Sequence, residues 1–183
     1  MADLSDTQFT LHHAEAEAEV EMSQETLSAV IDGAVAKGDV LSVAELAGVM
    51  AGKRTADLIP LVHPANLTHL LVNASPDRAA GAVRIRTEAA AVGPAGVEVE
   101  ALTAASVAAL TVYDMIRDLE PGAVLRAVRL ISSSDGADGE WRRAGDGLDG
   151  QRPARSIRTA GRIVANPPGS RPPLGSPSRR HGR

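Results

Sequence analysis

Residues 96–115 constrain this chain more than any other segment, because they join a long apolar stretch to three carboxylates. Within residues 102–115 almost every side chain is apolar or small, which is the composition of a helix buried on all sides. Asp114 nevertheless lies in this stretch, and Glu98 and Glu100 lead into it. A carboxylate in an apolar environment costs free energy comparable to the stability of a domain, unless it is paired or used. The segment therefore predicts a functional site.

The composition narrows the class of protein. A chain of 183 residues is long enough for one domain with a substantial core. Only Phe9, Tyr113 and Trp141 are aromatic, so the core consists mainly of Ala, Val and Leu, and contacts between subunits could supply part of the burial. The absence of cysteine excludes disulfides, zinc–thiolate sites and a thiol nucleophile. The five histidines form no ligand pair on a helix, so we predict neither a metal site nor a cofactor.

Charge divides the chain into two unlike parts. The net charge is −4, but residues 151–183 contain eight Arg, six Pro and no Asp or Glu, which leaves residues 1–150 with a net charge of about −12. The C-terminal part has too few apolar residues to offset the entropy lost on ordering. We therefore predict a folded domain over residues 1–150 and a disordered Arg- and Pro-rich tail over residues 151–183.

Partners and location follow from the same patterns. Clustered Arg in the tail could contact nucleic acid, but no aromatic residues are interleaved with them, so an extension without a partner is the favoured interpretation. Residues 1–10 lack the apolar core of a targeting signal, and no apolar stretch reaches the roughly 18 residues that a membrane span needs. We expect a soluble cytoplasmic protein without a membrane partner.

The first predicted elements are a strand and two helices. In residues 12–22, Ala, Val and Met alternate with Glu, which predicts a strand with one buried and one wet face. Ser23 and Asp39 are predicted helix N-caps. The first helix is expected to end at Gly33 and the second to run to Arg54.

The remaining segments complete an α+β pattern. Prolines bound residues 59–64 as a loop, and strands are predicted over residues 67–74 and 82–87 around a turn at residues 75–78. The apolar helix follows, and residues 123–131 form a last strand. The order β-α-α-β-β-α-β predicts a ferredoxin-like α+β fold with its helices on one face of an antiparallel sheet.

Lysine is rare enough to be informative. The chain has 17 Arg but only two Lys, Lys37 and Lys53. Lysine supplies a compact, titratable ammonium, which arginine cannot because its pKa exceeds about 12. Lys37 precedes a predicted helix start, where backbone N–H groups and a cation together favour an anion. An ordinary exposed lysine is the alternative, and we favour a functional role for Lys37.

Three sequence blocks together resemble a known family. Residues 37–40 read Lys-Gly-Asp-Val, and residues 53–64 read Lys-Arg-Thr-Ala-Asp-Leu-Ile-Pro-Leu-Val-His-Pro. With residues 96–115, they match in order and spacing the cyclic pyranopterin monophosphate synthases, the molybdenum-cofactor protein C family. The similarity extends from about Asp3 to Trp141. The resemblance implies a ferredoxin-like fold, a hexamer built as a trimer of dimers with sites at subunit interfaces, and the conversion of cyclised dihydro-GTP to cyclic pyranopterin monophosphate and pyrophosphate.

The same resemblance implies the catalytic residues. Asp114 aligns with the catalytic aspartate, and Arg117 takes the position of the catalytic lysine. Lys37 is expected to act as an acid or base and as a phosphate partner. Because Arg117 holds its charge, it can stabilise charge but cannot exchange a proton near neutral pH. A surface ion pair between Asp114 and Arg117, worth at most about 1 kcal/mol, is the alternative.

Substrate binding is expected from two further segments. His63 aligns with a substrate-binding histidine, and Leu61 and Val62 accompany it, with Val62 in place of the usual Cys. A histidine bonded to a neighbouring carbonyl is the alternative for His63. Weaker candidates for phosphate contacts are Lys53, Arg54 and Arg129.

The carboxylates before the apolar helix are the other binding candidates. Glu98 and Glu100 alternate with Val97 and Val99, so we expect a short extended segment from which both carboxylates point the same way. They could accept N–H donors from a purine or pterin ring, or form a solvated strand face. The resemblance implies substrate contacts at Val99 and Glu100.

Several positions depart from the family pattern. Basic residues near the N-terminus are replaced by Thr7 and His12, and Arg117 replaces a lysine. The late loop, usually Lys-Ser-Gly-Gly-Lys-Ser-Gly, reads Ser-Ser-Asp-Gly-Ala-Asp-Gly at residues 133–139, so Ser133 and Ala137 stand for lysines. A catalytically inactive homologue that serves as an oligomeric interaction module is therefore the alternative function. The family residues that are kept favour the enzyme; they are Lys37, His63, Glu100 and Asp114.

Overall fold

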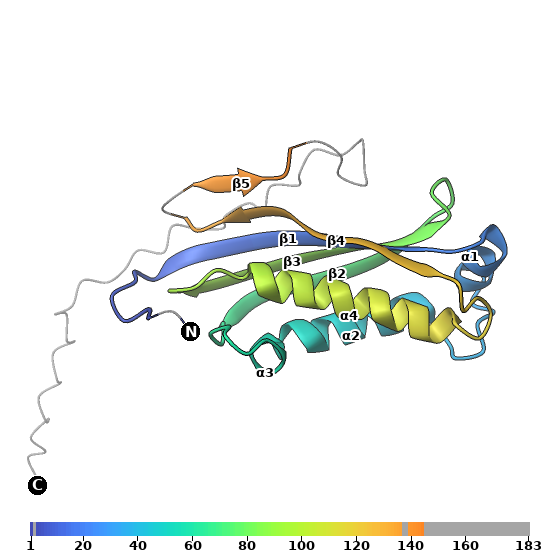
Figure 1. Cartoon of the computed structure of the whole chain (residues 1–183), viewed down its shortest axis with the longest axis horizontal. Helices are drawn as coiled ribbons and strands as arrows, with labels where there is room; N and C mark the ends of the chain where they lie inside the picture. The colour runs from blue at the N-terminus through green and yellow to red at the C-terminus, as the bar shows by residue number, and fades with distance from the viewer. Residues whose placement is uncertain (2, 137–138, 145–183) are drawn as a thin grey trace, which may run out of the picture. The chain divides into compact units, whose positions relative to one another are not determined.

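The computed structural model describes residues 1, 3–136 and 139–144. The predicted tail, the predicted boundary at residue 150, and Ala137 and Asp138 lie outside these residues. Nine elements follow one another along the described chain (Figure 1): β1 (Thr10–Glu21), α1 (Gln24–Ile31), α2 (Val40–Gly52), α3 (Thr55–Leu58), β2 (Leu67–Asp77), β3 (Ala82–Gly93), α4 (Glu98–Ile116), β4 (Val124–Ser134) and β5 (Glu140–Arg142).

The predicted fold class is confirmed. The five strands form one antiparallel sheet in the order β2-β3-β1-β4-β5, and the pattern is the ferredoxin-like α+β fold. Figure 1 shows α2 and α4 together on one side of this sheet. Helix α4 packs against β1, β3 and β4, and α2 packs against α4 and β2. The core between the layers is built mainly from Ala and Val, as the composition predicts.

Strand β1 confirms half of the prediction made from its alternation. The side chains that face the helices, Ala14 to Val20 at even positions, are almost fully buried. The opposite face is not fully exposed to solvent, because Glu17 and Glu19 are only 1% and 5% exposed. Glu17 accepts a 2.6 Å hydrogen bond from Arg129 Nε, and Arg84 Nε lies 3.3 Å from Glu19. Since β1 is central, arginines from the strands on both sides pair with its carboxylates.

Element boundaries differ from the prediction at the β2–β3 hairpin. The turn lies at residues 78–81 rather than 75–78, because Asp77 accepts hydrogen bonds from the backbone N–H groups of Ala79 and Ala80. Pro76 is accommodated in β2 because β2 is an edge strand of the sheet. Residues 59–64 lie outside helices and strands, as predicted, whereas α3 and β5 were not predicted.

Helix α4 is the core helix, but it is not buried on all sides. Ala101, Ala105 and Val112 are fully buried, whereas Leu110 is exposed. On α2, exposed apolar side chains recur at Val43, Leu46 and Met50, the spacing of one helix face. The domain as described therefore leaves apolar helix surface uncovered.

Length and composition alone would allow α4 to cross a membrane, which corrects the expectation that no segment could. It is the one such helix in the described ranges. More than half of this apolar stretch is buried in the domain, because α4 packs against one side of the sheet (Figure 1).

The close approach of α2 to α4 gives a stability prediction. A Cβ added at Gly48 would lie 2.9 Å from the Ala104 carbonyl oxygen and 3.2 Å from Ala108 Cβ. Gly48→Ala should therefore lower the free energy of unfolding by about 1–3 kcal/mol, although Ala is the better helix former. In Gly122→Ala, the matched control, the new methyl group meets no atom within 4 Å. Urea denaturation of both variants measures the difference, and equal stability would contradict tight helix packing.

Candidate active site

The structure brings the three predicted catalytic residues together at the C-terminal end of α4. Lys37 Nζ donates a hydrogen bond to the Asp114 carbonyl oxygen and lies 3.4 Å from Asp114 Oδ2. Arg117 Nε lies 3.3 Å from Asp114 Oδ1. The Asp114 carboxylate thus has one cation at each oxygen.

Local sequence explains how Lys37 reaches this place. Asp39 caps α2 by accepting hydrogen bonds from the N–H groups of Leu41 and Ser42, both at 3.1 Å. Gly38, with φ +105°, makes the turn before the cap. The Lys37 ammonium is thereby directed at the last turn of α4, where a cation interacts favourably with the helix dipole.

Asp114 is more exposed than the sequence suggests. Its side chain is 56% exposed, because Val112, Met115 and Ile116 face the core and Asp114 lies on the other side of the helix. The apolar stretch therefore supports the carboxylate without enclosing it. Sequence reasoning also missed Asp118, whose Oδ2 lies 3.9 Å from Lys37 Nζ. Its position in the turn directly after α4, four residues beyond Asp114, is the signal that could have identified it.

The expected extended segment at Glu98 and Glu100 is wrong. Both residues lie in the first turn of α4, where each residue advances about 100° around the helix axis. Two positions apart, the carboxylates point to different sides: Glu100 is 3% exposed, whereas Glu98 is partly exposed. The β-like alternation misled because a strand and a helix start share the same short pattern.

Glu100 is a carboxylate in an unfavourable environment. Burial raises its pKa, and the nearby Glu98 raises it further, against a lowering contribution from a backbone hydrogen bond. Its Oε2 is buried without a hydrogen-bond partner among the described residues. An unpaired buried acceptor of this kind fits a ligand with N–H donors.

The block at residues 53–64 adjoins this same end of α4. A Cβ at Gly52 would lie 3.3 Å from the Glu100 carbonyl oxygen, so the residues after α2 start beside Glu100. Lys53, Arg54 and Leu61 are exposed there, and Val62 and His63 are half-buried. Arg129, in contrast, lies in β4 and pairs with buried Glu17, so the structure gives it a role in the sheet.

The two groups of candidates are far apart within one chain. Asp114 and Glu100 are 14 positions apart on one helix, which separates their backbones by about 21 Å. One chain therefore does not place the predicted acid–base residues beside the predicted binding residues.

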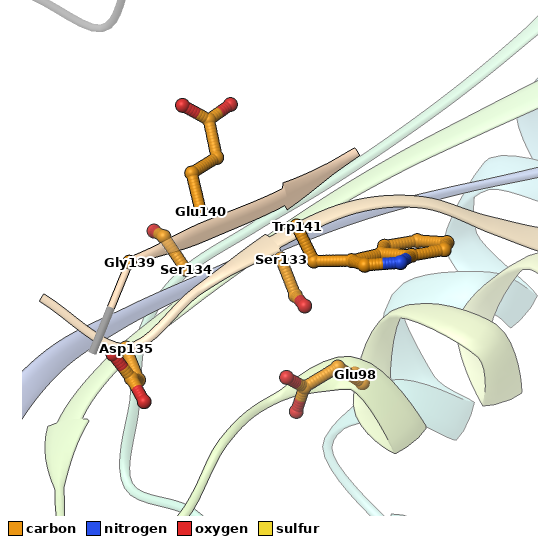
Figure 2. A pocket seen from close by; sticks show the side chains of 7 residues that line it. All are labelled: Glu98, Ser133, Ser134, Asp135, Gly139, Glu140 and Trp141. Atoms are coloured by element: carbon orange, nitrogen blue, oxygen red, sulfur yellow. The ribbon is translucent and has the colours of Figure 1, made fainter. Parts of the chain in front are cut away.

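Two neighbouring cavities lie near the N-terminal end of α4. The first, of about 290 Å³, is shown in Figure 2, where the Ser133 hydroxyl and the Glu98 carboxylate point toward one another and Glu140 points away. The second, of about 510 Å³, shares Glu98 and Asp135 with the first. The residues that complete its lining are Thr7, Gln8, Thr10, His12, Pro94 and Gly96.

The lining of these cavities contains several departures from the family pattern. Thr7, His12 and Ser133, which stand at basic positions of the pattern that the sequence resembles, contribute to it, and Asp135 adds a carboxylate beside them. His12 is buried, with its Nε2 3.0 Å from the Gly93 carbonyl oxygen. Because a carbonyl only accepts, His12 donates from Nε2.

The environment of Glu100 gives a pH prediction. The pKa of Glu100 is higher in the folded state than in the unfolded state, where it is near 4.5. The contribution of Glu100 to the free energy of unfolding is therefore fully present below pH 4.5 and is lost as pH rises through the folded-state pKa. Glu100→Gln should therefore be more stable than the parent at about pH 7, and the difference should vanish below about pH 4. Urea denaturation at both pH values measures this, with Glu25→Gln as control. A variant that is less stable at both values would show that the carboxylate is well paired.

Comparison with known proteins assigns the chain to a family. The model of the MoaC family matches residues 1–136. A cyclic pyranopterin monophosphate synthase of Chloroflexus aurantiacus is 46% identical over 78% of this chain and 88% of its own length. Proteins of the same name from Methylobacterium sp. and Brucella ovis are 48% and 45% identical over 77% of this chain, and over 88% and 86% of their own lengths. The resemblance read from the three sequence blocks is confirmed, and the chain belongs to the MoaC family.

Proposed function

We propose that this protein is a cyclic pyranopterin monophosphate synthase, a lyase of molybdenum-cofactor biosynthesis. Its substrate would be cyclised dihydro-GTP, and its products cyclic pyranopterin monophosphate and pyrophosphate. Membership of the family supports this proposal. The observation that carries it is the meeting of Lys37 with Asp114, 77 positions apart in sequence, in a solvent-accessible cluster with Arg117.

The rearrangement requires a proton shuttle for ring opening and reclosure, and cations that offset phosphate charge at cyclisation. We assign the shuttle to Asp114, whose carboxylate is accessible to a substrate. Lys37 would donate or accept a proton at Nζ and contact phosphate. Arg117 would stabilise negative charge only, because its guanidinium does not titrate near neutral pH.

Ring binding would use the other end of α4. Glu100 would offer ring N–H groups an acceptor that no residue within 1, 3–136 and 139–144 pairs, with Val99 beside it and with Leu61, Val62 and His63 on the adjoining loop. Lys53 and Arg54, both exposed next to this loop, would contact phosphate.

A homo-oligomer would join the two half-sites. Because about 21 Å separates them within a chain, a second subunit would bring its Lys37–Asp114 end beside the Glu100 end of the first. Exposed apolar side chains on α2 and α4 offer surface for such contacts: Val43, Leu46, Met50 and Leu110. We propose a hexamer, arranged as a trimer of dimers, in the cytoplasm.

The inactive homologue remains the alternative to be tested. The acidic cavity lining is the feature that motivates it, since carboxylates there repel phosphates. The comparisons do not favour it, because the similar relatives carry the name of the synthase.

Substitutions at Asp114 and Arg117 test the proposed chemistry. Asp114→Asn should lower turnover by about 10²-fold or more, because it removes the proton carrier with little change of shape. Arg117→Lys should raise turnover, since it restores a titratable group where acid–base catalysis is worth about 10²–10⁴-fold. Formation of cyclic pyranopterin monophosphate from enzymatically generated cyclised dihydro-GTP is the measurement, and exposed Asp32→Asn is the control.

Two results would contradict these assignments. Full activity of Asp114→Asn would exclude Asp114 as the proton carrier. An inactive parent protein that Arg117→Lys does not activate would favour the inactive homologue.

A further inference from the structure

The carboxylate of Glu120 joins the turn after α4 to the start of α1. Its Oε2 accepts hydrogen bonds from the Ser23 backbone N–H at 2.9 Å and from Ser23 Oγ at 2.8 Å, and Oε1 lies 3.1 Å from the same N–H. Ser23 is also the N-cap of α1 and accepts a hydrogen bond from the Thr26 N–H. One side chain from the end of α4 therefore holds the residue from which α1 starts.

The ionised state of Glu120 suits this role. Burial alone would raise its pKa, but hydrogen bonds from Ser23 and Thr26 outweigh burial and lower the pKa. The carboxylate is therefore charged at neutral pH, and its bonds to Ser23 are charge-assisted. The turn that carries it is braced by Tyr113, whose hydroxyl donates to the Pro121 carbonyl oxygen at 3.2 Å.

A second contact with the C-terminal end of α4 is made by Lys37. Residues 23–37 are thus attached at both ends to one short region: Ser23 to Glu120, and Lys37 to the Asp114 carbonyl oxygen. The connection after α1 is anchored in the core by buried Val35, whereas Cβ atoms at Gly33 and Gly38, on either side of it, would meet no described atom within 4 Å. A long lysine side chain in an exposed ion pair gains little from the pair alone. The position of Lys37 therefore depends on how the segment that ends at it is held, by Val35 in the core and by Ser23 at its start.

We propose that Glu120 is a positioning residue for Lys37: by holding Ser23, it keeps the segment 23–37 closed against α4 and the Lys37 ammonium on Asp114. We call the contact of Glu120 with Ser23 the clamp. Its effect on catalysis rests on the proposed function, whereas its geometry does not.

The rarity of lysine makes the clamp directly measurable. The chain has two lysines, so acylation with a small amine-reactive reagent, followed by mass spectrometry, reports the labelling of Lys37 and of exposed Lys53 separately in one sample. A hydrogen-bonded ammonium must break its bonds before it reacts, so Lys37 should react more slowly than Lys53. In Glu120→Ala the ratio of Lys37 to Lys53 labelling should rise by about threefold to tenfold, the effect of losing charge-assisted hydrogen bonds.

Matched variants separate positioning from helix capping. Glu25→Ala removes a neighbouring exposed carboxylate from the first turn of α1 and weakens that helix, but it leaves Glu120 and Ser23 in place. It should leave the labelling ratio unchanged. Glu120→Gln keeps the shape of the side chain and one acceptor oxygen, so the labelling ratio should rise less than in Glu120→Ala. It replaces Glu120→Ala in the experiment if that variant does not fold.

Turnover gives a second, independent readout. In Glu120→Ala, kcat/KM should fall about tenfold at a temperature where the variant is fully folded, because misplacing a reacting group slows catalysis. A lower Tm with parental labelling and parental kcat/KM would show that Glu120 only caps α1, and would overturn the inference. If the parent has no turnover, the proposed function fails, while the labelling ratio still decides whether the clamp exists.

Discussion

The close antiparallel contact of α2 with α4 determines where the acid–base and ring-binding candidates lie. Gly48 and Gly52 face the backbone and small side chains of α4, so the two helices approach more closely than larger residues would allow. As a result, the start of α2 meets the end of α4, and the end of α2 meets its start. The first meeting joins Lys37 to Asp114, and the second places residues 53–64 beside Glu100.

This arrangement places different chemical groups at the two ends of one helix. At the C-terminal end, Lys37 and Arg117 flank Asp114, which suits proton transfer beside phosphate. At the N-terminal end, Glu100 is buried with an oxygen that has no partner in the described part of the chain, which suits ring N–H donors. If, as we propose, one substrate contacts both ends, a second subunit has to supply one of them. The uncovered apolar side chains of α2 and α4 agree with such contact.

Much of the fold could be predicted because its signals are local. The strand β1, its helix-facing side and the caps Ser23 and Asp39 depend on neighbours within a few residues, and the structure confirms these features. The burial of Glu17 could not be predicted, because it depends on Arg129, which is 112 positions away. The helical start at Glu98 failed for another reason: four residues are too few to distinguish a period of 2 from one of 3.6.

In the candidate site, too, local sequence signals could be predicted and contacts between distant segments could not. Motif blocks identified Lys37, Asp114 and Arg117, and the structure brings them together. Asp118 and Glu120 were missed because their partners, Lys37 and Ser23, lie on loops that are far away in sequence.

Subunit complementation tests the central claim most directly. Asp114→Asn and Glu100→Gln chains, carrying different tags, are co-expressed, and the mixed oligomers are purified and assayed beside each single variant. If every site combines Asp114 of one subunit with Glu100 of another, random pairing leaves about a quarter of the sites intact, and about a quarter of parental activity should return. Mixed oligomers as inactive as the single variants would show that each site lies within one chain, and would contradict the account.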